Sequence, residues 1–302
     1  MLTSFLVLEI TALISLIWAL KFKITKLTWI TMLIVTILNA GYVYWLMPVP
    51  TLSQLVMPVA VESAIVVVWA LITGASAQVV QRVTKRGTHI SFEGLTIWPF
   101  IIPIIAFLIS LGAGVSQALT VRPMYNSVQA TVKKEAPLTK DDQPIALSAQ
   151  ASQNMMKKAF SQVPDSSMYR LGDLSAQYIN GKPYYVAPVE FNGFMSWLMN
   201  RTLPGYFIIS ATDINDTAHF VKEKLDYSET SWFSHNIARK IYMRNPKYAQ
   251  VGEPILEIDN NNQAYWVQTL LNVRWAGQLM CDDIHVSLTN ADTGKTTVYS
   301  KK

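Results

Sequence analysis

The chain has 302 residues, a mean hydropathy of +0.23 and a formal net charge of +5, and this length is enough for two ordinary domains. Residues 122–302 hold 19 basic and 17 acidic side chains, and a few loop residues before position 121 supply the larger part of the excess. This distribution gives no basic face, so we exclude nucleic acid as a partner. The single cysteine excludes an internal disulfide framework.

The first part of the chain contains four apolar segments, each long enough to cross a bilayer, which takes about 20 residues. They are Leu2–Leu20, Leu27–Met47, Leu55–Val80 and Trp98–Val121. The last segment contains no Asp, Glu, Lys or Arg and separates the two parts of the chain. We predict a four-helix transmembrane domain over residues 1–121.

Charges in the connecting loops predict an orientation. The loop after the first segment holds three lysines, the loop after the third holds Arg82, Lys85 and Arg86, and the turn between the second and third holds no charge. Positive loops stay cytoplasmic, so we predict a multi-pass cell-membrane protein, N-out and C-out, with residues 122–302 outside the cell. A large exterior domain without disulfides is typical of a bacterial envelope, most plausibly Gram-positive.

Three polar side chains, Glu9, Asn39 and Glu62, fall in the outer half of the predicted membrane. Polar groups at that depth are costly and mark functional sites by default. The functional hypothesis is an intramembrane polar site that lines a wet cavity. The structural alternative, which we favour, is that each group is protonated, hydrogen-bonded to a neighbouring helix or solvated near the headgroups.

Residues 122–144 mix charges with prolines and predict a linker or stalk. A first α+β unit is expected over residues 145–215. It begins with a helical pattern in which Met155, Met156 and Phe160 share a face. Asn180-Gly181 stands between two alternating runs and predicts a hairpin, because both central residues of a type I′ turn need positive φ.

The segment from residue 191 to 206 is the most aromatic part of residues 122–302. Its functional interpretation is a partner patch formed by Phe191, Phe194, Trp197 and Tyr206. The structural alternative is a lid over the domain core, and we favour it because aromatic side chains supply much of the burial in small domains.

A second α+β unit is expected over residues 216–302. Residues 216–225 predict a helix capped by Asp216, and residues 231–245 predict another that ends before Pro246. Three strands and a short last strand follow. A helix with an antiparallel meander thus occurs twice, which predicts a duplicated unit with a helix on one face of each sheet.

Two stretches carry a resemblance to known proteins. The ending WVQTLLN…DIHVSLTNADTGKTTVYS resembles the close of a PepSY-type module, apart from Asn290 and Ala291. The run GKPYYVAPVEFNGFMSWLMNRTLPGYFIISATD, with IARKIYMRNP and EIDNNNQAYWVQTL after it, is similar to the exterior region of a poorly characterised Firmicutes membrane protein family. The resemblance covers most of residues 145–300. It implies PepSY-like extracytoplasmic modules but no known reaction and no catalytic residue.

We predict no cofactor and no metal site. Cys281, Asp283 and His285 would share one face of a strand, but three ligands on one strand rarely close around an ion. The oxygen-rich segments 213–216 and 259–262 lack the glycine and distal glutamate of an EF-hand, and turn formation accounts for both. Residues 122–302 contain no GxSxG, P-loop or HExxH motif.

These observations predict a non-enzymatic, membrane-anchored binding or assembly module that acts on an envelope protein, peptide or wall polymer. Open sheet edges and the aromatic segment would supply the contacts, and the chain could also form homo-oligomers. The first alternative is an oligomeric channel or translocation component that uses the transmembrane bundle. The second is an envelope hydrolase assembled from distant residues around His219 or His235.

Overall fold

The computed structural model describes residues 4–10, 12, 26–51, 145–273 and 279–300. It also describes helical positions 54, 55, 58, 61, 64, 65, 68, 104, 105, 108, 109, 111, 112 and 115. The chain divides into two compact units. The first comprises Met1–Gln129 and Val273–Met280, and the second comprises Ala130–Asn272 and Cys281–Lys302.

The described residues of the first unit do not form the predicted membrane architecture. Its longest described helix is α2, Lys26–Leu46, whose 21 residues include Asn39 and several threonines, tyrosines and tryptophans. Among the residues that the structure describes, no helix combines the length and the apolar character needed to cross a bilayer. This finding overturns the predicted four-helix transmembrane domain and the multi-pass, N-out and C-out location in the cell membrane. Most of the other three predicted segments lies outside the described residues.

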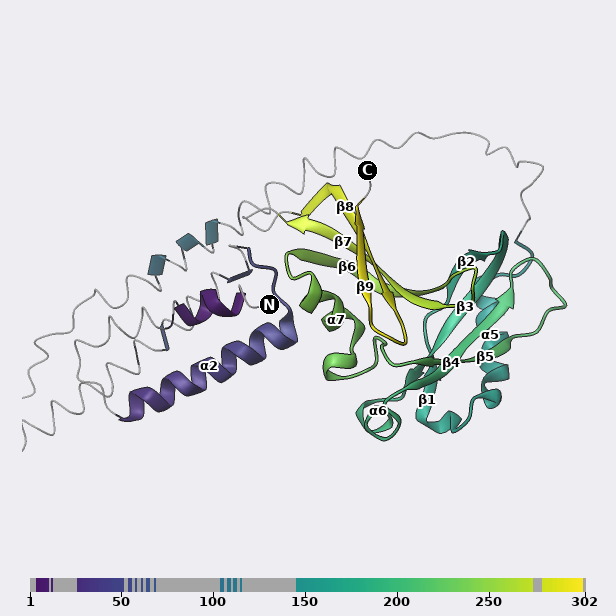
Figure 1. The fold of residues 1–302 in the computed structure, drawn as a ribbon, viewed down its shortest axis with the longest axis horizontal. Coiled ribbons are helices and arrows are strands. Elements are labelled where there is room, and N and C mark those ends of the chain that lie inside the picture. The colour runs from purple at the N-terminus through teal and green to yellow at the C-terminus, as the bar shows by residue number, and fades with distance from the viewer. Residues whose placement is uncertain are drawn as a thin grey trace, which may run out of the picture. The chain divides into compact units, whose positions relative to one another are not determined.

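The second unit contains two antiparallel sheets (Figure 1). The first has the order β1-β3-β4-β5, with β2 also paired to β3. Its strands are β1 Tyr169–Leu171, β2 Ser175–Ile179, β3 Lys182–Phe191, β4 Leu203–Ser210 and β5 His219–Leu225. The second sheet has the order β6-β7-β8-β9. Its strands are β6 Tyr248–Ile258, β7 Ala264–Val273, β8 Leu279–Asn290 and β9 Thr296–Ser300.

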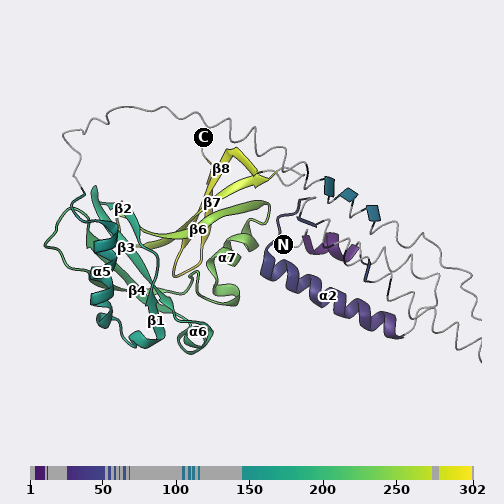
Figure 2. The same ribbon diagram turned by 180° about the vertical axis from the view of Figure 1, so that it is seen from behind.

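Helix α5, Ala149–Ala159, covers one face of the first sheet, and in Figure 2 it lies in front of β3 and β4. Ser148 caps its N-terminus by accepting a hydrogen bond from the backbone N–H of Ala151 at 3.2 Å. Met156 is fully buried on this helix. The helix predicted at the start of this unit is therefore confirmed, and a short 3₁₀ turn, Phe160–Gln162, continues it.

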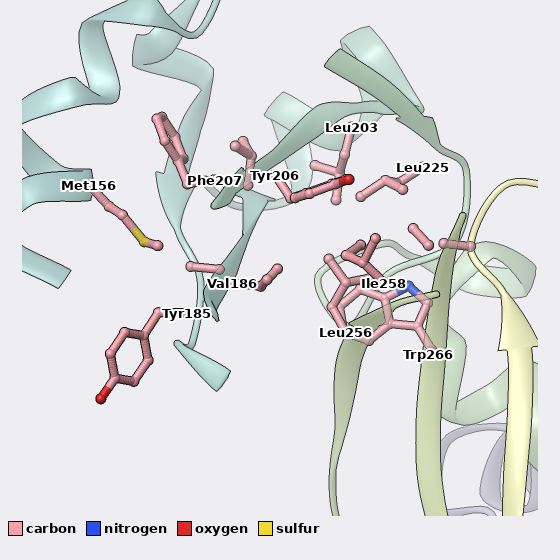
Figure 3. Packing of buried hydrophobic residues seen from close by; sticks show 14 of the residues in the cluster. Met156, Tyr185, Val186, Leu203, Tyr206, Phe207, Leu225, Leu256, Ile258 and Trp266 are labelled. Carbon is pink, nitrogen blue, oxygen red and sulfur yellow. The ribbon is translucent and has the colours of Figure 1, made fainter. Parts of the chain in front are cut away.

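The other face of the first sheet packs against the second sheet. Side chains two positions apart on a strand share a face, so Val186 and Pro188 of β3 point the same way. Tyr206 of β4 pairs with Pro188 and therefore lies on this face as well. Figure 3 shows Val186 on the side of the first sheet from which Leu256, Ile258 and Trp266 of the second sheet approach. Val186, Tyr206 and these three side chains of the second sheet belong to one hydrophobic core, and none is more than 5% exposed. The two sheets therefore form one folded body.

The β2–β3 hairpin has the predicted turn. Ile179 pairs with Lys182 across it, and the two turn residues have positive φ, 51° for Asn180 and 75° for Gly181. This is the geometry that a type I′ turn requires. The predicted hairpin is confirmed.

The helix predicted over residues 216–225 is wrong, because this segment forms β5. Phe220 pairs with Phe207 of β4, and Leu225 is fully buried. Asp216 does not cap a helix; its carboxylate accepts from the backbone N–H groups of Ser210 and Thr217, each at 2.8 Å. Residues 219–225 form a strand because they pair with the otherwise free hydrogen-bonding edge of β4. Local sequence propensity gives no information about such an edge. The prediction of two separate helix-plus-meander units is corrected accordingly, since β5 completes the first sheet.

Two short helices connect strands: one lies between β3 and β4, and the other between β5 and β6. Helix α6, Phe194–Asn200, follows β3, and helix α7, Ile237–Arg244, precedes β6. Residues 231–245 had predicted one helix; only the part from Ile237 is α-helical, and Phe233–His235 form the 3₁₀ turn η4. Asn236 caps α7 by accepting from the backbone N–H of Arg239 at 3.1 Å. Gln250 of β6 donates to the carbonyl oxygen of Ala238 at 2.8 Å, which ties α7 to the second sheet.

A side-chain amide joins the two sheets. Gln177 of β2 donates through Nε2 to the carbonyl oxygen of Leu256 at 3.2 Å and accepts from the backbone N–H of Ile258 at 2.7 Å. Ser175 Oγ also donates to the Leu256 carbonyl, at 3.3 Å. The amide of Gln177 therefore takes the place that a neighbouring strand would occupy beside β6.

We expect the Gln177→Ala variant to lower the free energy of unfolding by about 1–3 kcal/mol. It leaves the backbone N–H of Ile258 without its partner and removes one of the two donors to the Leu256 carbonyl oxygen. Urea unfolding measures this change. The neighbouring Tyr178→Ala variant serves as the control, because Tyr178 is 70% exposed and its loss should change stability by less than about 0.5 kcal/mol. Equal stabilities of the two variants would contradict the bridging role of Gln177.

Candidate functional site: an acidic cavity

A cavity of about 280 Å³ lies in the second unit, and residues at the start of β2, at the end of β3 and along β6 line it. Its apolar wall consists of Leu174, Pro188, Pro254, Ile255, Leu256 and Trp266. Five carboxylates line the rest: Asp173, Glu190, Glu229, Glu253 and Glu257. No lysine, arginine or histidine is among the described residues that line it. The cavity therefore concentrates negative charge in a chain whose net charge is positive.

Glu190 is the most buried of these acids. It stands on β3 opposite Arg170 of β1, and the guanidinium binds its Oε2 with N–O distances of 2.8 and 3.0 Å. The carboxylate-bearing side chain is only 9% exposed. Burial raises the pKa of Glu190, and the charge of Arg170 partly opposes this rise. Arg170 occupies one oxygen, and among the described residues Oε1 has no hydrogen-bond partner.

Gly172 makes room for this carboxylate. A Cβ at Gly172 would lie 2.7 Å from Oε1 of Glu190 and 2.9 Å from a side-chain carbon of Pro188. The backbone N–H of Gly172 donates to the carbonyl oxygen of Pro188 at 2.8 Å, so the two segments cannot easily separate. Any larger residue at this position would displace the Glu190 side chain.

Glu229 reaches the cavity from the loop between β5 and η4. Two hydrogen bonds fix the loop at this point. Thr230 Oγ1 accepts from the backbone N–H of Phe191 at 3.0 Å, and Asn236 donates to the Glu229 carbonyl oxygen at 2.8 Å. Burial, followed by the charges of Glu190, Glu253 and Asp173, raises the pKa of Glu229 to about 7. Glu229 is therefore close to half-protonated at neutral pH.

Trp266 is the largest apolar side chain among the residues that line the cavity. It pairs with Leu256 across the β6–β7 ladder and is 2% exposed. Its Nε1 donates to the carbonyl oxygen of Tyr227 at 2.7 Å, so the one polar atom of the indole is already satisfied. The ring therefore contributes an apolar, π-rich wall beside the carboxylates.

The arrangement suits an organic cation better than a metal ion. Among the described side chains, no group of three or more His, Cys, Asp or Glu converges as a metal site requires. Carboxylates spread around about 280 Å³ can instead accept hydrogen bonds from different sides of one ammonium or guanidinium group. The volume lies just below the usual range of small-molecule pockets, which fits one long side chain with its apolar stem along the wall.

The predicted partner patch does not form one surface. Phe191, Trp197 and Tyr206 are no more than 2% exposed, whereas Phe194 is 38% exposed. Tyr206 faces the second sheet, and Phe191 packs against Tyr169 with ring centroids 5.8 Å apart. The structure places other apolar side chains beside Phe194, namely Met195, Leu198 and Met199, all exposed on α6.

The structure brings two of the three predicted intramembrane residues together. Glu9 accepts hydrogen bonds from Asn39 Nδ2 at 3.0 Å and from Thr36 Oγ1 at 2.9 Å. Glu62 lies outside the described residues. The channel alternative stays a prediction.

The other segments considered for metal ions have local partners. Asp259 Oδ1 accepts from the backbone N–H groups of Asn261 and Gln263, each at 2.8 Å, and Asp213 Oδ1 accepts from that of Asn215 at 2.9 Å. His285 pairs with Asp283 at 3.0 Å, and the side chain of Cys281 lies outside the description. Asp259 and Asp213 therefore organise turns, as the turn alternative predicted.

The acidic cavity itself has no sequence motif. Its five acids are spread from position 173 to position 257 and meet only because two sheets pack together. One signal was present: Glu190 interrupts the otherwise apolar run YYVAPVEF, and an acid at a buried strand position needs a partner or a function. Comparison of the chain with protein-family models, with curated proteins and with solved structures finds no match. The resemblance to PepSY-like modules stays a prediction.

Proposed function

We propose that the second unit is a binding module that holds a cationic side chain, Lys or Arg, of a partner protein in the acidic cavity. One observation carries the proposal: five carboxylates surround one cavity, and among its described lining residues only Glu190 has an ion-pair partner. Carboxylates held close together repel one another, and a cation placed between them relieves that repulsion. The binding role predicted from the sequence is kept in this form.

The raised pKa of Glu229 supports this function. The cavity holds more negative charge than it can keep ionised at neutral pH, so Glu229 retains a proton for part of the time. A cationic ligand would favour the ionised carboxylate and displace that proton. Binding should therefore tighten as the pH rises through 7.

A fluorescein-labelled peptide of alternating lysine and serine is a direct probe, with fluorescence polarisation as the measurement. We expect binding that weakens about threefold to tenfold in the Glu253→Gln variant, because one exposed ligand charge is worth about 1 kcal/mol. The Asp213→Asn variant, which removes a carboxylate from the β4–β5 loop, should bind as the unmodified chain does. No binding of the lysine peptide, or equal binding of a glutamate–serine peptide, would refute the proposal.

One observation favours a second candidate function, acid–base hydrolysis of a glycan. A carboxyl with a pKa of about 7 beside other carboxylates is the pairing in which one group donates a proton and another acts as base or nucleophile. Release of new reducing ends from a chitin oligosaccharide, lost in both Glu229→Gln and Glu253→Gln, would support hydrolysis. Peptide binding without any such release would support the first function.

A further inference from the structure

Two chain segments connect the acidic cavity to helix α6. β3 supplies Glu190 to the cavity and continues to Phe194 at the start of α6, and the β5–η4 loop supplies Glu229 and continues to Trp232. The rings of Phe194 and Trp232 meet edge to face with centroids 5.0 Å apart. Consecutive Cα atoms are 3.8 Å apart, so each of these connections spans at most about 15 Å.

Helix α6 presents a dense apolar face. Four of its seven side chains are large, apolar and exposed, by 38% for Phe194, 59% for Met195, 40% for Leu198 and 63% for Met199. We call these four residues the α6 surface. A cluster of exposed apolar side chains marks an interaction site more often than scattered ones do, and methionines adapt well to a partner's shape. The buried Trp197 anchors the helix from below.

We propose that the α6 surface binds the apolar side of an amphipathic segment of the partner protein, with a Lys or Arg of the same segment in the acidic cavity. This inference rests on the proposed function. Charge complementarity selects the occupant: the cavity attracts a cation beside an apolar surface, and a basic amphipathic segment carries both features. An anionic phospholipid would instead place its phosphate against the carboxylates.

The distances fit a helical segment of a few turns. The Cα atoms of Glu190 and Phe194 lie at most about 15 Å apart, a length that a helix covers in about ten residues at 1.5 Å per residue. Leu or Met side chains two turns away from the Lys would therefore reach the α6 surface. An extended segment of four or five residues would cover the same distance.

Two peptides of equal charge test this inference by fluorescence polarisation. One is an 18-residue amphipathic helix of lysine and leucine, and the other has serine in place of every leucine. We expect the leucine peptide to bind at least tenfold tighter to the unmodified chain. In a Met195→Ser, Leu198→Ser, Met199→Ser triple variant the difference should fall below threefold. All three side chains are exposed, so the variant should fold, and thermal unfolding checks this.

The control variant is Ile214→Ser. Ile214 is 66% exposed on the β4–β5 loop, at the opposite end of β4 from α6, and its loss should leave the tenfold preference unchanged. A preference that survives the triple variant would overturn the inference. If both peptides bind equally and both lose affinity in Glu229→Gln, the inference fails and the proposed function stands. If neither peptide responds to Glu229→Gln, the proposed function fails as well. Capture by phosphatidylcholine vesicles that depends on the α6 surface would identify a lipid occupant and overturn the inference.

Discussion

Replacement of Glu229 by glutamine is expected to weaken binding of a lysine-rich peptide about thirtyfold at pH 8. Removing one charged partner of a desolvated ion pair costs about 2–5 kcal/mol, and the half-buried position of Glu229 places it near the lower limit. Because Glu229 ionises near pH 7, the unmodified chain should bind more tightly at pH 8 than at pH 6, and the variant should lose most of this pH dependence. Fluorescence polarisation at both pH values measures the change.

The same variant should be more stable than the unmodified chain at pH 8. The folded-state pKa of Glu229, about 7, lies above its ordinary value of 4.5, so the folded state holds the proton more tightly than the unfolded state does. Its contribution to stability is complete below pH 4.5 and is lost as the pH rises through 7. A fully buried carboxyl would lose about 1.4 kcal/mol per pH unit, and after discounting for solvent screening we expect about 1–2 kcal/mol in total.

Urea unfolding between pH 4.5 and 8 tests both the higher stability of the variant at pH 8 and the pH dependence of the difference. The unmodified chain should lose stability over this interval relative to the glutamine variant, and the two should converge near pH 4.5. Asp213→Asn is the matched control and should follow the unmodified chain. A glutamine variant that is less stable at pH 8 would show that Glu229 is held by favourable contacts instead of strained by its neighbours.

Replacement of Trp266 by alanine should lower the free energy of unfolding by about 3–5 kcal/mol. The indole is 2% exposed and packs at the junction of the two sheets, so its removal opens a large void and leaves the Tyr227 carbonyl without its donor. The variant should also lose affinity for the lysine peptide, because the apolar wall of the cavity loses its largest side chain. Urea unfolding and polarisation measure the two effects.

Tyr265 provides the comparison for this prediction. It is the next residue on β7, points to the opposite face of the sheet and is only partly buried. The Tyr265→Ala variant should cost less than about 1.5 kcal/mol and leave peptide binding intact. A similar loss of stability in both variants would mean that Trp266 is not a junction residue.

Sequence rules for turns and helix caps correctly predicted the elements that depend on neighbouring residues alone. The hairpin at Asn180-Gly181 depends on two φ angles, and α5 depends on a cap and an apolar stripe, so both were visible in the chain itself. β5 was missed because its conformation depends on the free edge of β4. The long apolar segments before position 121 predicted membrane helices from composition alone, whereas none of the described helices meets that requirement.

The candidate site was beyond the same rules. Phe191, Trp197 and Tyr206 are aromatic as Phe194 is, and only the face of the strand or helix on which each lies, together with packing, decides which of them reaches solvent. Only Glu190 has a signal in the sequence, as an acid in an otherwise apolar strand, and our sequence predictions did not include it. The other four carboxylates come together only through the packing of the two sheets, and no spacing in the sequence predicts that packing.

The amide bridge from Gln177 to β6 also bears on the order of folding. It joins residues about 80 positions apart, whereas the β2–β3 hairpin closes over a two-residue turn. Contacts between distant positions form later than local ones, because a longer loop must close first. We therefore expect the carboxylates of the cavity to converge only after both sheets have formed. Their mutual repulsion should then oppose the last step of assembly and leave the early hairpins undisturbed.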